Sequence, residues 1–289
     1  MKVSGLISHG LSRKQKRAAR HALLYALLSI FSVSTVFPLL WMLSTSLKSG
    51  DIIFEIPPRL LPDGFHWENY ARAVTEIDFL VLFRNSAFVA FLQLLSNVFV
   101  SAFVAYGFAR FQFPGRNVWF LLVLSTIMLP GEVTMIPVFI GFSEIGWINS
   151  FKPLVIPGFF GGSPVFIFLL RQFFLSIPRE LEESAIVDGA GSFRIFVRIY
   201  LPLSVPALMT IGILSFQGSW NDLLGPLIYL NDTDKFTLPL GLSMFNGVMK
   251  VEWGPLMAGS ILALIPVLLV FLLAQKYFVA GFKLSGIKG

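Results

Sequence analysis

Six long stretches of the chain are apolar and uncharged, and they constrain the fold more than any other feature. A helix that crosses about 30 Å of hydrocarbon needs roughly 20 apolar residues. The runs are continuous rather than alternating and are longer than barrel strands, which excludes a closed barrel. They cover residues 22–47, 85–109, 117–131 (continued after Glu132 by 133–142), 153–170, 199–221 and 254–275. The sequence therefore predicts an all-α membrane protein with six transmembrane helices.

Composition supports this fold class. Charged residues make up 13% of the 289 residues, about half of the roughly 25% found in soluble domains, and the mean hydropathy is +0.77. A soluble enzyme, a nucleic-acid-binding module or a disordered regulator with so few charges would expose large apolar areas. These classes are excluded, and membrane lipid rather than nucleic acid is the expected environment.

The positions of the cations predict the orientation. Of the 22 Lys and Arg residues, 15 lie before the first run, between runs two and three, between runs four and five, and after the last run. Because cytoplasmic loops carry the excess of Lys and Arg, both termini are predicted to be cytoplasmic. The expected organisation is a basic segment 1–21, a permease domain 22–282 and a tail 283–289. The first run exceeds the length of a signal-peptide core and no cleavage site follows it, so an uncleaved helix is expected.

Residues 176–202, here termed the bracket, predict two short helices at the cytoplasmic surface. Pro178 suits a first helical turn, and the three glutamates that follow place negative charge where the helix dipole favours it. This helix should end near Gly189, and Ser192 can cap a second helix that runs directly into the fifth span. An apolar stripe on the second helix comprises Phe193, Phe196, Val197, Tyr200 and Leu201. Periodicity alone leaves an interfacial amphipathic helix with snorkelling arginines as an equally good interpretation.

The spacing within the bracket resembles a known signature. It is similar to the EAA motif of ABC importer permeases, which is matched by Glu183-Ser184-Ala185, then Gly189, then Ile199-Tyr200-Leu201-Pro202. Asp188-Gly189-Ala190 fits the common form of the motif, and Ser184, in place of alanine, is the one departure. Other segments resemble the binding-protein-dependent carbohydrate-uptake family, in particular its maltose-type second permease subunit. They are Trp41-Met42-Leu43, Asn69-Tyr70, Trp220-Asn221, 237–242 and the ending 285–289.

This resemblance implies a permease subunit that forms half of the translocation pathway for a sugar or sugar-like solute and is itself no enzyme. ATP and Mg would be bound by a separate cytoplasmic ATPase dimer, since the chain has no phosphate-binding loop of the G-x-x-x-x-G-K-[ST] type. The other implied partners are a second, different permease and an extracellular or periplasmic solute-binding protein, in the plasma (inner) membrane of a prokaryote. The residues implied in ATPase coupling are Glu183, Ser184, Ala185, Asp188, Gly189, Ala190, Ile199, Leu201 and Pro202.

Two acids within or next to the spans, Glu132 and Asp222, are candidates for the translocation path, together with Trp220 and Asn221. An acid in the membrane usually faces the bundle interior or water. A hydrated helix break or a structural position explains each acid as well as a solute contact does. The chain has no cysteine and three histidines without metal-ligand spacing, so no metal site is expected.

Two segments on the outer side, 48–83 and 231–253, are longer than turns. The first contains Trp67-Glu68-Asn69-Tyr70, which predicts a short interfacial helix, and the segment is either a lid on the bundle or a partner surface. The second is a candidate contact for the solute-binding protein by family resemblance, although Asp232, Asp234 and Lys235 fit a solvated turn equally well.

Three other functions remain as alternatives. A secondary transporter driven by an ion gradient would use Glu132 and Asp222 as a relay, but it predicts internal repeats that the sequence does not show and leaves the bracket spacing unexplained. An intramembrane hydrolase lacks the expected H-E-x-x-H or G-x-S-x-G motif. An ABC permease for a non-sugar solute agrees less well with the outer and C-terminal matches.

Overall fold

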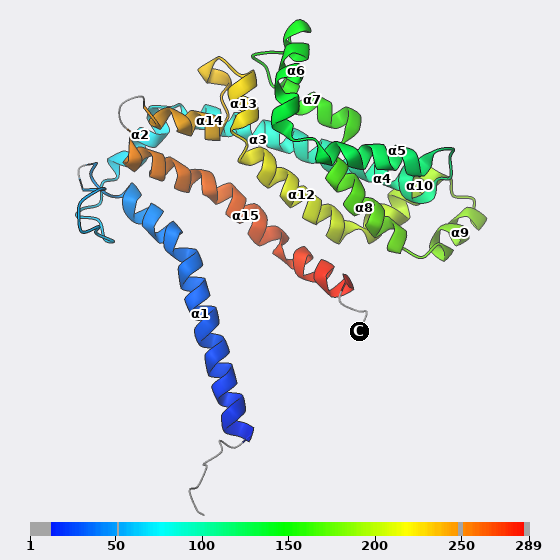
Figure 1. The fold of residues 1–289 in the computed structure, drawn as a ribbon, viewed down its shortest axis with the longest axis horizontal. Coiled ribbons are helices and arrows are strands. Elements are labelled where there is room, and N and C mark those ends of the chain that lie inside the picture. The colour runs from blue at the N-terminus through cyan, green and yellow to red at the C-terminus, as the bar shows by residue number, and fades with distance from the viewer. Residues whose placement is uncertain (1–12, 51, 248–250, 286–289) are drawn as a thin grey trace, which may run out of the picture.

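The computed structural model describes residues 13–50, 52–247 and 251–285, and within these residues every element longer than an isolated bridge is a helix (Figure 1). Residues 1–12 and 286–289 of the two predicted tails, and 248–250 of the predicted outer segment, lie outside the described residues. The α-helices are α1 (Arg13–Ser46), α2 (Glu68–Thr75), α3 (Phe79–Leu95), α4 (Ser101–Arg110), α5 (Arg116–Ser125), α6 (Gly131–Glu144), α7 (Lys152–Gly161), α8 (Pro164–Ser176), α9 (Glu180–Val187), α10 (Ser192–Ile195), α11 (Leu201–Leu203), α12 (Val205–Trp220), α13 (Leu224–Tyr229), α14 (Leu238–Leu242) and α15 (Trp253–Ser285). The π-helical turns are η1 (Ser96–Val100) and η3 (Phe196–Tyr200), and the 3₁₀ turns are η2 (Thr126–Met128), η4 (Thr233–Lys235) and η5 (Ser243–Phe245).

The helices account for the six predicted spans. Four are long and apolar enough to cross a membrane, and two bent helix pairs bring the number to six if each pair is one span. The four are Ala19–Ser46, Phe79–Arg110, Lys152–Ser176 and Trp253–Gln275. Two of them, Phe79–Arg110 and Lys152–Ser176, extend past the predicted runs 85–109 and 153–170, because the helices continue through Arg84 and Arg171.

Each of the two bends lies next to a proline at the start of a helix. The first separates Arg116–Met128 from α6 by 100° at Leu129-Pro130, and the second separates Ser192–Leu203 from α12 by 78° at Ser204. Pro130 precedes the first residue of α6, and Pro206 lies in the first turn of α12, so each proline suits a helix start rather than a helix interior. The expectation that the second bracket helix runs directly into the fifth span was wrong.

Two glycines let α7 and the connection between α7 and α8 lie close to η1 and to the start of α4. A Cβ on Gly158 would lie 2.5 Å from Ser96 Oγ, and one on Gly162, where φ is +65°, would lie 2.8 Å from Ser101 Oγ. The Ser163 N–H donates to Ser101 Oγ at 3.1 Å. Small residues at such crossings are typical of membrane helices, whose association depends on close backbone packing.

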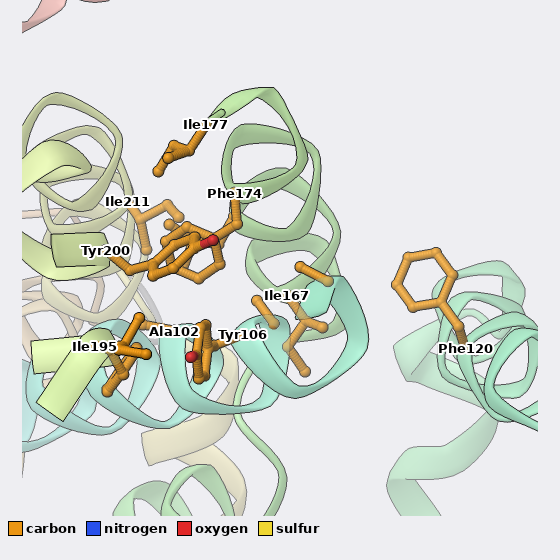
Figure 2. Close-up of a cluster of buried hydrophobic side chains, with 13 residues drawn as sticks. Ala102, Tyr106, Phe120, Ile167, Phe174, Ile177, Ile195, Tyr200 and Ile211 are labelled. Carbon is orange, nitrogen blue, oxygen red and sulfur yellow. The ribbon is translucent and has the colours of Figure 1, made fainter. Parts of the chain in front are cut away.

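The buried apolar residues form two separate clusters. One lies at the bracket end of the bundle, where α4 packs against α8, and includes Tyr106, Phe174 and Tyr200 (Figure 2). The other lies between α3, α12, α14 and α15 and includes Leu82 and Trp220.

Helix α1 leans away from the bundle along most of its length (Figure 1). The side chains of its central part are exposed, and it meets α15 near its C-terminal end. There Asn69 of α2 donates two hydrogen bonds, to the carbonyl oxygens of Ser46 (3.0 Å) and Lys48 (2.9 Å). These bonds satisfy carbonyls that the end of a helix leaves free. A short helix at the predicted position is thus confirmed as α2, and it anchors the end of α1.

Candidate functional site

The first bracket helix, α9, ends in a turn that requires glycine. The Gly189 N–H donates to Ile186 O and the Ala190 N–H donates to Ala185 O, both at 2.9 Å. This pair of bonds is a Schellman motif, which needs a left-handed residue just after the helix. Gly189 supplies it, with φ of +77°. The predicted helix end is therefore confirmed.

The second bracket helix begins differently from the prediction. Gly191, with φ of −74° and ψ of 161°, occupies the capping position, and Ser192 is the first helical residue of α10 without a capping side-chain bond. The stripe on this helix is divided: Phe196 and Tyr200 are buried, whereas Phe193 and Val197 are exposed. The division arises because π-helical turn η3 shifts the side-chain register within the segment.

One side of the bracket is open. Glu183 is exposed and forms no ion pair with any residue in the described part of the chain. Ile186, Phe193 and Val187, the last 87% exposed, surround the turn with apolar surface. An exposed apolar patch next to a free carboxylate is typical of a protein-docking surface.

The other side is fixed to the bundle by Arg110, the last residue of α4, whose side chain is 3% exposed. Its Nη2 donates to the carbonyl oxygens of Phe174 (2.5 Å) and Ile177 (2.6 Å) at the end of α8. Its Nε lies 3.7 Å from Glu182 Oε2, and its guanidinium lies 4.9 Å from the ring centre of Tyr200. We term Arg110, Glu182 and Tyr200 the clamp.

Tyr200 completes the clamp from the second bracket helix. Its hydroxyl donates to Glu182 Oε2 at 2.9 Å. Its ring lies 4.9 Å from that of Tyr106 and 5.5 Å from that of Phe174, so the aromatic cluster of Figure 2 surrounds it. The Tyr106 hydroxyl in turn donates to Ser192 O at 3.3 Å. Both bracket helices are therefore held against α4 and α8.

The structure gathers the predicted coupling residues in the bracket but on different faces. Glu183, Ser184, Asp188, Gly189 and Pro202 are exposed, whereas Ala185, Ala190, Ile199 and Leu201 are partly buried against the core cluster. The small side chains of Ala185 and Ala190 thus serve packing against the bundle. Sequence reasoning missed the clamp, because it treated Arg110 only as a loop cation and Glu182 only as a helix-dipole partner.

The four predicted path residues are not brought together. Glu132 is exposed in the first turn of α6, directly after the 100° bend. Asp222 Oδ1 accepts a hydrogen bond from the Gly225 N–H at 3.1 Å, which satisfies a free donor at the start of α13. Trp220 is 2% exposed, and its Nε1 donates to Ala263 O of α15 at 3.0 Å.

A hollow of about 320 Å³ lies between α12, α14 and α15. Trp220 and Asn221 contribute to its wall, together with Gln217 and Ser260, and the remaining wall is apolar. Amide and hydroxyl groups next to an indole ring are suitable contacts for a polyhydroxylated solute. Glu132 and Asp222 do not line this hollow.

The second outer segment begins with a largely exposed turn, residues 231–235, which is hydrogen-bonded to a distant part of the chain. Asn149, in the connection between α6 and α7, accepts bonds from the Asn231 and Asp232 N–H groups (both 3.1 Å) and donates to Asp232 Oδ2 (2.7 Å). Lys235 Nζ lies 2.8 Å from the same Oδ2. These two donors, Lys235 first, lower the pKa of Asp232 below its usual value. Sequence reasoning missed Asn149, because its bonding partners lie 82 and 83 residues further along the chain.

Comparison with known proteins identifies the family. Residues 97–284 match the family described as "Binding-protein-dependent transport system inner membrane component". The chain belongs to this family. The matched residues extend from α4 to α15 and include the whole bracket. The chain is accordingly a multi-pass membrane permease subunit and not an enzyme.

Relatives of the permease are similar to it in sequence along nearly the whole chain. The probable ABC transporter permease protein YurM of Bacillus subtilis is 37% identical over 92% of this chain and 88% of its own length. The arabinooligosaccharides transport system permease protein AraQ of the same species is 36% identical over 90% of this chain and 93% of its own. The trehalose/maltose transport system permease protein MalG of Thermococcus litoralis is 31% identical over 90% and 94%.

A solved structure shares the fold. A chain of a bacterial ABC transporter that imports the acidic polysaccharide alginate matches with a TM-score of 0.80 and 25% identity, over 94% of this chain and 100% of that one. The match supports the assignment to ABC importer permeases and confirms the all-α membrane fold.

Proposed function

We propose that this permease forms half of the translocation pathway of an ATP-driven importer for a sugar or sugar-like solute. The observation that carries the proposal is the bracket, whose open face presents Glu183 and an apolar surface while its other face is fixed to the bundle. A cleft on a separate ATPase dimer would accept this face, with charge-assisted hydrogen bonds to Glu183. ATP and Mg belong to that dimer, and this chain binds no cofactor.

The remaining assignments complete the assembly. Both termini and the bracket face the cytoplasm of a prokaryotic cell, in agreement with the distribution of Lys and Arg. The segments 48–83 and 231–253 then face outward, where a solute-binding protein delivers the solute. A second, different permease supplies the other half of the pathway, and the exposed length of α1 offers it and the lipid a large apolar surface.

The solute class rests on two arguments. The relatives described above are named for arabinooligosaccharides, for trehalose and maltose, and for alginate. The hollow beside Trp220 offers Gln217, Asn221 and Ser260, whose side chains match sugar hydroxyls. The ion-gradient alternative would place an acidic relay in the bundle, whereas Asp222 is engaged with the Gly225 N–H and Glu132 does not line the hollow.

The coupling role is tested in the assembled transporter. Glu183→Ala and Gly189→Asp are expected to abolish solute uptake into proteoliposomes, because both change the docking face. Glu180→Ala is the matched control, since Glu180 is also an exposed acid of α9. Normal uptake by both variants with a fully assembled ATPase would refute coupling through the bracket.

Two further measurements test the energy source and the solute. Uptake should stop when the ATPase is omitted while the proton gradient is kept, and continued uptake would favour a secondary transporter. The unfolding temperature of the cognate solute-binding protein should be raised by at least one of these sugars: arabinooligosaccharides, trehalose, maltose or alginate oligosaccharides. Stabilisation only by amino acids or phosphate would contradict the sugar assignment.

A further inference from the structure

The clamp joins α4, α9 and η3, and its buried cation also binds the end of α8. Arg110 belongs to α4, the carbonyls of Phe174 and Ile177 belong to the end of α8, and Glu182 belongs to α9. A buried guanidinium is costly unless acceptors surround it. The carbonyls at a helix C-terminus carry partial negative charge, so the end of α8 is a suitable site for it.

The carboxylate of Glu182 is the only charged partner that the described residues offer Arg110. Its side chain is 19% exposed, so the pair is screened less than a surface ion pair. The same oxygen, Oε2, accepts the hydroxyl of Tyr200. Glu182 therefore connects α9, η3 and α4 at one point.

The bend at Ser204 shows why this connection matters. Because Ser192–Leu203 and α12 meet at 78°, a force on the bracket does not continue along one straight helix into the fifth span. The clamp provides a second attachment, to α4 and α8, which are also packed against each other.

We propose that Arg110 and Glu182 are positioning residues that make the bracket, α4 and α8 move as one body. Motion of the ATPase is then delivered to the second and fourth spans through the clamp, in addition to the fifth span through Ser204. This inference rests on the proposed function for the source of the motion, and on the contacts above for its path.

The test variant is Glu182→Gln. It keeps an oxygen that accepts the Tyr200 hydroxyl but removes the charge that faces Arg110, and it leaves the exposed docking face unchanged. Glu182→Asp keeps the charge at a greater distance and should give an intermediate result. Glu180→Gln removes an exposed acid from the same helix and is the control. Arg110 itself is left intact, because its loss would leave the end of α8 without a donor.

Two readouts are taken on the complete transporter in proteoliposomes. The first is solute transported per ATP hydrolysed, which we expect to fall about fivefold or more in Glu182→Gln, the low end of coupling between sites, while assembly and ATP hydrolysis persist. The second is the distance between spin labels at Glu180→Cys in α9 and Leu169→Cys in α8, introduced into a chain without cysteine. For this readout Glu182→Gln is combined with the labelled cysteine pair. The pair without Glu182→Gln should give one narrow distance distribution with and without nucleotide, and the pair with Glu182→Gln should give a broad one.

The proposal requires both results. An unchanged transport ratio or an unchanged distance distribution in Glu182→Gln would overturn it, as would an equal effect of Glu180→Gln on the transport ratio. If the wild type itself shows no ATP-driven uptake, the proposed function fails instead. The spin-label comparison still decides in that case whether Glu182 holds the bracket to α8.

Discussion

Replacing Gly189 by Ala is expected to loosen the end of α9 and leave the rest of the bundle unchanged. At φ of +77°, a residue with a Cβ costs about 1–2 kcal/mol relative to glycine. No atom lies within 4 Å of the added Cβ, so no steric cost is added. The substitution also removes about 0.4–1 kcal/mol of chain entropy from the open state, which acts in the opposite direction. The net effect is roughly 1 kcal/mol, or about a fivefold larger open population.

Hydrogen exchange measures this population directly. The amide of Ala190, which donates to Ala185 O, should exchange about fivefold faster in Gly189→Ala than in the wild type. Gly191→Ala is the matched control, because Gly191 has equally open surroundings and a φ of −74° that any residue adopts. The reasoning would be refuted if the Ala190 amide exchanged at the wild-type rate in Gly189→Ala, or if its exchange rate increased equally in Gly191→Ala.

Gly189→Asn separates the conformational role from the docking role. Asparagine tolerates the left-handed region better than alanine, so exchange at Ala190 should return toward the wild-type rate. If the ATPase approaches the turn closely, solute uptake should remain impaired in this variant because its side chain is larger. Recovery of both exchange and uptake would show that Gly189 acts through the backbone alone.

Further predictions concern the opposite end of the bundle. Gly241→Ala places a Cβ against the buried side chain of Leu82 and should destabilise the purified permease by about 1–3 kcal/mol in thermal unfolding, whereas wild-type stability would contradict the close packing there. Asn149→Gly removes three side-chain hydrogen bonds without backbone strain and should increase the mobility of a spin label in the turn that follows α13; an unchanged spectrum would show that Asn149 does not hold this turn. Because the pKa of Asp232 is lowered by Lys235, its stabilising contact is present above the unfolded pKa of about 3.9 and is lost as the pH falls through the lower folded value. The same label should therefore become mobile on acidification, and equal mobility from neutral to strongly acidic pH would contradict this assignment.

The sequence predicted the spans because their signal is local. Each apolar run is long enough to define a helix by itself, and the helix of Asn69 and Tyr70 was also found. A helix break was one interpretation of Glu132, but the angles of the bends at Pro130 and Ser204 were not predicted, since a proline shows where a helix can start but not the angle to the preceding helix. That angle depends on packing between helices that are distant in the sequence, which a single sequence does not display.

The bracket was predictable for the same local reason, and the clamp was not. The glutamates after Pro178 and the glycine at 189 carry their structural signals within a few residues. Arg110 and Glu182 are 72 positions apart, and each had a sufficient local explanation. Only the fold shows that the end of α4 meets the start of α9. The outer turn held by Asn149 was missed because its bonding partners also come from a distant segment.

The two buried clusters are centred at opposite ends of the molecule. Substitutions around Leu82 and Trp220 should thus impair reception of the solute while sparing the response to nucleotide, and substitutions around Tyr106 and Tyr200 should do the reverse. Defects of the two kinds can be sorted genetically, and suppressor mutations are expected to arise within the cluster that was damaged. A suppressor in the opposite cluster would instead identify residues that communicate between the two ends of the bundle.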